Sequence, residues 1–169
     1  PVTAQLDRYL AQHSRFADDT LVVIGGGGND AYAQFSAVCW GTDENGLGVG
    51  NTSMAAATAA IEKAASTQVA NVKRIQDKGA SVILVYSASD WSRNPFARKY
   101  LSPEYQATGC YTPVPAAQVT AWVKRFNQIL QDDIAGVPGV VLVDTTATFA
   151  DALDNPARHG FTNVSEPAC

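Results

Sequence analysis

Three short apolar runs do most to limit the folds that this chain can adopt. They are residues 20–25 (TLVVIG), 81–86 (SVILVY) and 139–144 (GVVLVD). Each run is almost continuous in Val, Ile and Leu instead of alternating between apolar and polar residues. Such runs are typical of strands in a parallel sheet that is covered on both faces. We therefore expect three buried parallel strands.

Longer stretches with helical periodicity precede and separate these runs. Residues 53–78 and 116–133 carry apolar side chains at steps of three and four, and residues 2–13 are a shorter stretch of the same kind. This alternation of helix and strand predicts the α/β class, with right-handed crossovers. Residues 1–169 contain no linker or internal repeat, so we expect a single domain.

Two long loops, residues 35–52 and 87–115, are expected after the carboxyl ends of the first two strands, where the functional loops of open α/β sheets lie. A three-stranded sheet also has two edges, which natural proteins usually protect with charges or proline. The interiors of the three apolar runs contain neither. We therefore expect at least one further strand that is not part of this chain.

Composition excludes several classes of partner. The net charge is −4 and the 12 Lys and Arg residues are scattered, whereas phosphate binding needs clustered basic residues, so nucleic acid is not expected as a partner. The apolar runs are far shorter than the roughly 20 residues of a transmembrane helix. Three cysteines and two histidines match no zinc-binding spacing, so we expect no metal, and no other cofactor is indicated.

The cysteines leave two alternatives open. They are Cys39, Cys110 and Cys169. Either two of them form a disulfide in a secreted protein, for which Cys110 with Cys169 is the expected pair and Cys39 stays buried and free, or all three are free thiols.

A glycine run, residues 25–28, follows the first strand and leads into Asn29 and Asp30. Three interpretations compete. The run fits the loose form of a dinucleotide-binding loop, but Asp30 would place negative charge where the pyrophosphate binds. It fits equally a structural turn that needs positive φ. In the third interpretation, Asn29 donates a hydrogen bond to a developing oxyanion, which is typically worth about 2.7–4 kcal/mol in the transition state.

The segment Gly27-Gly28-Asn29-Asp30 resembles the G-x-N-D block of the SGNH, or GDSL, esterases and lipases. Residues 141–169 are similar to the segment that these enzymes carry before their last block, including the pattern N-P-A-x-x-G-F-x-N over residues 155–163. The opening stretch TAQLDRYLAQH is similar to the helix before their G-x-N-D strand. The resemblance is strongest to the bacterial secreted branch, which implies a secreted, periplasmic or cell-surface location.

The resemblance implies a flavodoxin-like three-layer α/β/α sandwich and a carboxylic ester hydrolase, acting on esters or lipids through a serine acyl-enzyme. Asn29 takes the oxyanion-hole role. The G-D-S block that carries the nucleophile and the D-x-x-H block that carries the base are absent from this sequence. We therefore expect an incomplete fold, inactive alone, that is complemented by N-terminal and C-terminal segments of the same enzyme.

Gly28 and Asp30, which flank Asn29, and Trp91 in the second loop are the expected substrate-binding residues. Four loop aromatic residues are expected either to form an acyl-chain pocket or to anchor the loops: Trp40, Trp91, Phe96 and Tyr100. The remaining polar candidates are expected to have structural roles, with Ser87 and Ser89 lining a pocket or capping a loop, Asp144 in a structural hydrogen bond, His13 at a helix end and His159 solvated in a loop.

Two other functions are compatible with the residues alone. One is a non-catalytic binding or scaffold relative of the esterases. The other is a nucleotide-binding flavodoxin-like domain, which the glycine run would serve.

Overall fold

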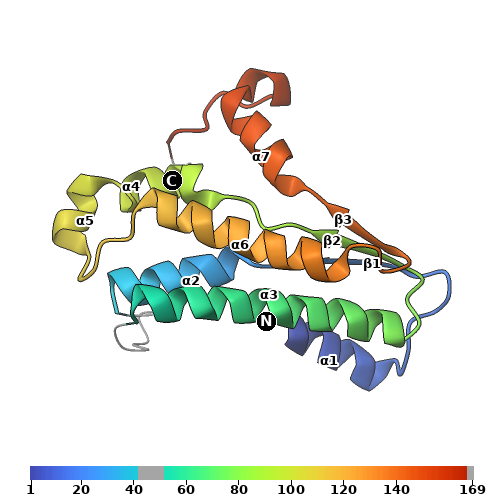
Figure 1. Cartoon of the computed structure of the whole chain (residues 1–169). Helices are drawn as coiled ribbons and strands as arrows, with labels where there is room; N and C mark the ends of the chain where they lie inside the picture. Colours follow the sequence, from blue (N-terminus) through green and yellow to red (C-terminus); the bar gives the residue numbers. More distant parts are fainter. Residues whose placement is uncertain (42–51, 167–169) are drawn as a thin grey trace.

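A computed structural model describes residues 1–41 and 52–166. Its sheet contains three parallel strands in the order β1-β2-β3, namely β1 (Leu21–Gly25), β2 (Val82–Tyr86) and β3 (Val140–Val143). Figure 1 shows these strands beside long helices. The predicted α/β class, the parallel sheet and all three predicted strands are confirmed.

The helices begin and end close to the predicted positions where periodicity was strong. The long helices are α1 (Val2–Gln12), α3 (Met54–Asp77) and α6 (Ala116–Ile134). Four shorter α-helices and two 3₁₀ helices complete the described residues: α2 (Gly28–Cys39), α4 (Pro95–Tyr100), α5 (Pro103–Gly109), α7 (Thr145–Asp154), η1 (Trp91–Arg93) and η2 (Pro156–His159). In these residues no helix is both long and apolar enough to cross a membrane.

The two predicted loops are largely helical, so that part of the prediction is wrong. The first loop was expected from residue 35, but α2 continues to Cys39, and residues 42–51 lie outside the described part. The second contains η1, α4 and α5. Asn94 and Ser102 cap α4 and α5, and each precedes a proline at the first helical position. Asn-Pro and Ser-Pro signal helix starts as well as turns, which explains the error.

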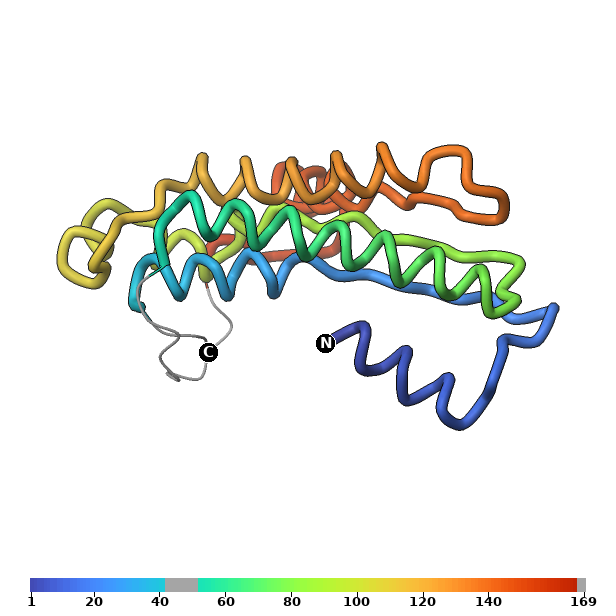
Figure 2. Tube along the Cα trace, turned by 60° about the horizontal axis from the view of Figure 1, so that its bottom comes forward, coloured from blue at the N-terminus to red at the C-terminus, as the bar shows by residue number. Residues whose placement is uncertain are grey.

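Helices α3 and α6 cover one face of the sheet, where they lie side by side (Figure 1). The side chains on this face form the core, with Ile24, Ile83 and Val85 all buried. Figure 2 shows α1 on the outer side of this layer. A pair of hydrogen bonds between Thr3 and Asn71, with the amide Nδ2 donating to the hydroxyl oxygen at 3.0 Å, fastens α1 to α3.

The opposite face of the sheet is bare in the described residues. Its side chains alternate with the core residues along each strand, and five large ones are 39–56% exposed: Leu21, Val23, Val82, Tyr86 and Val141. The continuous apolar runs predicted strands covered on both faces, and the described helices cover only one. The second apolar face is therefore available to chain segments other than those described.

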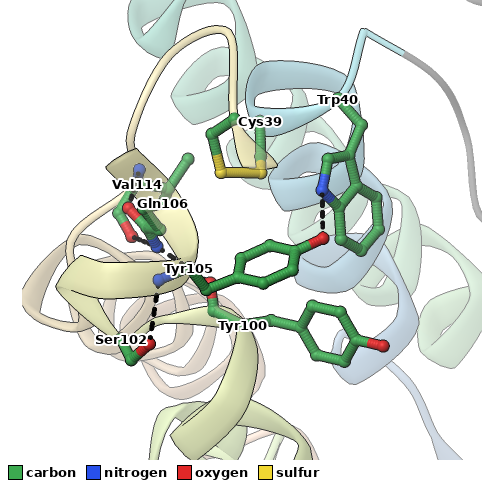
Figure 3. Close-up of a disulfide and its surroundings, with 8 residues drawn as sticks. Cys39, Trp40, Tyr100, Ser102, Tyr105, Gln106 and Val114 are labelled. Carbon is green, nitrogen blue, oxygen red and sulfur yellow. Dashed lines mark hydrogen bonds between the residues drawn. A yellow bond between two sulfur atoms is a disulfide. The ribbon is translucent and has the colours of Figure 1, made fainter. Parts of the chain in front are cut away.

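A disulfide joins Cys39 to Cys110 (Figure 3). The expected pair of Cys110 with Cys169 is therefore wrong, as are the alternatives of a free Cys39 and of three free thiols; Cys169 itself lies outside the described residues. The bridge connects the end of α2 to the end of α5, two helices that the sequence analysis had placed in loops. Around it, Trp40 donates its indole N–H to the hydroxyl of Tyr105 at 3.1 Å.

Candidate functional site

A cavity of about 1330 Å³ opens at the carboxyl ends of β1 and β2. Its walls include the glycine turn and first helical turn of residues 25–30, the stretch 87–89 after β2, and side chains of α1 and α3. Strand ends of this kind are where open α/β sheets place their ligands. The four site residues expected from the sequence, Gly28, Asn29, Asp30 and Trp91, all line this one cavity.

The turn between β1 and α2 depends on glycine at one position. Gly27 precedes the first residue of α2 and has φ of 97°, a left-handed conformation that favours glycine. A Cβ atom there would lie 2.7 Å from Cε1 of Phe126, which is too close. At Gly28 a Cβ would meet nothing within 4 Å. The turn is therefore tight against α6 at Gly27 and open towards the cavity at Gly28.

Asn29 is the second residue of α2 and its side chain is exposed. Within residues 1–41 and 52–166 its carboxamide makes no hydrogen bond. The first main-chain bond of this helix runs from the N–H of Ala31 to the carbonyl of Gly27 at 3.0 Å, so the N–H groups before Ala31 have no partner inside the helix. The helix dipole adds partial positive charge at this end. Together these donors can stabilise negative charge that develops on an oxygen atom.

Asp30 follows as the third residue of α2 and is exposed. A carboxylate in the first turn of a helix interacts favourably with the dipole. The sequence analysis expected Asp30 to order the loop around Asn29, but among the described residues its side chain makes no hydrogen bond or ion pair. Its position beside the free N–H groups lowers the affinity of this end of the helix for a fully charged anion such as a pyrophosphate.

Trp91 forms an aromatic wall together with residues of α2 and α4. Its ring lies 6.0 Å from that of Tyr32 and 6.1 Å from that of Phe96, in edge-on contacts, and all three side chains line the cavity. The other two aromatic candidates lie outside it. The rings of Trp40 and Tyr100 are 5.6 Å apart near the disulfide, where they anchor α2 to α4 and α5. The two expected roles are therefore divided between the two pairs.

Ser87 belongs to a hydroxyl network that joins β2 to α7. Its Oγ accepts the main-chain N–H of Thr145 at 2.9 Å, and Ser89 shares a 3.3 Å contact with the Thr145 hydroxyl. Asn127 of α6 holds both main-chain atoms of Ala88, at 2.7 and 2.8 Å. The sequence analysis did not single out Thr145 or Asn127. These bonds indicate a loop-capping role for Ser87, and the network printed for it includes no histidine.

Comparison with known proteins now adds to this geometry. A family model described as GDSL-like lipase/acylhydrolase matches residues 2–169. The chain belongs to this family. A comparison with curated proteins finds no significant match. Membership in the GDSL-like family indicates a hydrolase of the lipase and acylhydrolase class, and it agrees with the α/β fold of the structure.

Asp144 and His159 of this GDSL-like chain have structural partners. Asp144 caps α7 by accepting the N–H of Thr146 at 2.8 Å, which is the kind of structural hydrogen bond expected for it. His159 is not simply solvated, because its Nε2 lies 2.7 Å from Oδ2 of Asp151. Hydrogen bonds from His159 and then from Asn155 lower the pKa of Asp151. His159 lies in η2 and does not line the cavity.

No group of three metal-ligating side chains occurs in the described part of this GDSL-like chain. The cavity walls present hydrogen-bond donors and aromatic rings instead. The arrangement at α2 can therefore orient a carbonyl group and accept a developing negative charge on its oxygen.

Proposed function

We propose that this chain supplies the oxyanion-binding part of a carboxylic ester hydrolase that works through a serine acyl-enzyme. In this proposal the Nδ2 atom of Asn29 donates a hydrogen bond to the ester oxygen as that oxygen becomes negative. One observation carries the assignment: the Asn29 carboxamide stands without a described partner at the positive end of α2, beside the open position of Gly28 and on the cavity wall. Asp30 then faces the same entrance and disfavours anionic acyl groups.

The nucleophile and the base are proposed to lie outside these 169 residues, because the sequence contains neither G-D-S nor D-x-x-H. The hydroxyl of Ser87 is engaged by Thr145 instead of by a base. We assign the nucleophile to a segment that pairs with the free edge of β1. Further segments would cover the bare face of the sheet, where Val23 is 52% exposed. This chain alone would then be inactive.

The chemistry follows from this arrangement. The serine oxygen attacks the ester carbonyl carbon while the base takes the serine proton, and the carbonyl electron pair moves onto the oxygen. Asn29 stabilises this oxyanion together with a free N–H of the first turn of α2. Collapse of the intermediate expels the alcohol oxygen, which receives the proton from the base. Water then repeats the same steps on the acyl-enzyme and releases the acid.

The aromatic wall is the proposed contact for the acyl chain. Trp91, Phe96 and Tyr32 present apolar rings to the cavity, next to the donors of α2. Such a wall favours an ester or lipid substrate with an apolar acyl group. We also propose a secreted, periplasmic or cell-surface location in a bacterium, since the disulfide between Cys39 and Cys110 needs an oxidising compartment to persist.

A fluorophosphonate probe tests the proposal directly. The protein is purified from its natural source, treated with the probe and measured by intact mass under denaturing conditions. The proposal expects the added mass on a serine outside residues 1–169, whether on the same polypeptide or on one that co-purifies. A label on Ser87 or Ser89 would refute the assignment of the nucleophile. Absence of any label would favour a non-catalytic binding relative, and stabilisation by a nucleotide would favour the dinucleotide interpretation.

A further inference from the structure

Gln68 of α3 is a buried amide for which the described residues provide no partner. Its side chain lines the cavity, and only 4% of its surface is exposed. Within residues 1–41 and 52–166 its Nε2 has no hydrogen-bond acceptor. A buried donor that stays unpaired costs about 1–3 kcal/mol, and the large majority of buried polar side-chain atoms are therefore paired.

Two other buried amides of the same chain follow the usual rule. Gln106 is 5% exposed, and its carboxamide holds both main-chain atoms of Val114: Oε1 accepts the N–H at 2.8 Å and Nε2 donates to the carbonyl at 2.7 Å (Figure 3). Asn71, one turn along α3 from Gln68, is paired with Thr3. Gln68 differs from both in having no printed bond, so its partner is to be sought outside the described residues.

The position of Gln68 limits what that partner can be. Its carboxamide lies against the main chain of Gly26, where a Cβ would be 3.5 Å from Oε1 and 3.8 Å from Nε2. Gly26 follows β1 directly and comes three residues before Asn29. The terminal torsion of a glutamine is broad and roughly two-fold, so either amide atom can face the cavity. Gln68 therefore lies under the turn, next to the end of β1.

We propose that Gln68 is a positioning residue: its carboxamide hydrogen-bonds a main-chain peptide group of the segment that carries the serine, and so fixes that segment against Gly26 and Asn29. The inference rests on the proposed function, because it takes the serine-bearing segment from there. A carboxamide offers one donor and one acceptor, which match one peptide group of a strand lying along β1. Gln106 already binds Val114 in this way.

A substrate group fits Gln68 less well. Gln68 is almost fully buried, whereas Asn29 is exposed at the entrance of the cavity, where an ester would arrive. Gln68 also belongs to α3, which covers the inner face of the sheet, and not to the loops above it. If substrate were its partner, removing the amide would raise KM. If the main chain is its partner, the same change lowers kcat and stability instead.

The test replaces Gln68 with methionine, which keeps the length of the side chain, in the complete protein that contains the serine-bearing segment. Gln76→Met is the matched control: it makes the same chemical change two turns further along α3, where Nε2 donates to the carbonyl of Pro138 at the surface. We expect Gln68→Met to lower Tm by about 2–5 °C, because a buried hydrogen bond is lost. The control should shift Tm by less than about 1 °C.

The rate of serine labelling by the fluorophosphonate gives the second readout. Misplacing a reacting group by a fraction of an ångström to one ångström costs about 10–100-fold, so we expect a fall of that size for Gln68→Met, with KM within about twofold. An unchanged or raised Tm, or an unchanged labelling rate, would overturn the inference while leaving the hydrolase intact. A raised KM at constant kcat would assign Gln68 to the substrate. A wild-type protein that takes no label would remove the proposed function, and the inference with it.

Discussion

Replacing Asn29 with alanine is the sharpest test of the oxyanion assignment. The Asn29 side chain is exposed and makes no hydrogen bond within the described residues, so its removal should cost the fold little. Alanine also has a higher helix propensity than asparagine, which offsets any small loss in the first turn of α2. The whole effect should therefore appear in the transition state, where one oxyanion donor is worth about 2.7–4 kcal/mol. This corresponds to a fall in kcat of roughly 10²–10³-fold.

The assay is steady-state hydrolysis of a chromogenic short-chain ester by the complete enzyme, with kcat and KM determined separately and Tm measured in parallel. KM should change little, because a donor aimed at the oxyanion contributes mainly in the transition state. Asn155→Ala is a suitable control, since this amide bonds Asp151 in the exposed region after α7. A loss of kcat below about threefold for Asn29→Ala, at unchanged Tm, would refute the reasoning.

Three further predictions concern stability. Replacing Cys39 with serine opens a bridge across a separation of 71 residues and should lower the free energy of unfolding by about 4 kcal/mol, measured in urea; a loss below about 1 kcal/mol would contradict the bridge. Gly27→Ala should cost about 2–4 kcal/mol by the same measurement, because of its positive φ and its contact with Phe126, and a neutral result would contradict the turn geometry. The pKa of Asp151 is lowered in the folded protein, so its carboxylate stabilises the fold above the ordinary pKa of 3.8 and this contribution is lost as the pH falls through the lowered pKa. The Tm difference between wild type and Asp151→Asn should shrink on acidification from pH 5 to 2, and a constant difference would exclude the bond to His159.

The strands could be predicted because their apolar runs leave few alternatives. Val, Ile and Leu at nearly every position of β2 exclude an amphipathic helix, and the burial of Ile83 and Val85 follows from it. Helix α2 was missed because a glycine run precedes it and hides the helix start at Gly28. The disulfide was assigned wrongly because its pairing depends on α5, which brings Cys110 to the end of α2. Pairings of this kind depend on tertiary contacts and not on local sequence.

The candidate site was only partly visible in the sequence. Asn29 could be found because the residues around it form a recognisable block, and its place beside the cavity follows from its position after β1. Gln68 was missed, although the spacing contained a signal for it. It falls between Ala65 and Val72 at steps of three and four, on the apolar stripe of α3, where a polar residue is unexpected. A polar residue on such a stripe needs a partner, and that partner lies on another segment.

The disulfide has a mechanical consequence for α2. This helix of 12 residues is held at its start by the tight turn at Gly27 and at its end by the bridge from Cys39. Asn29 lies about 3 Å from the first support, while Cys39 lies about 18 Å from it along the axis. If the far support is released, a tilt of about 5° would move the Cys39 end by about 1.5 Å but Asn29 by only about 0.3 Å, given these lengths. The site residue lies next to the pivot, so the position of its amide is protected from movements at the other end of the helix.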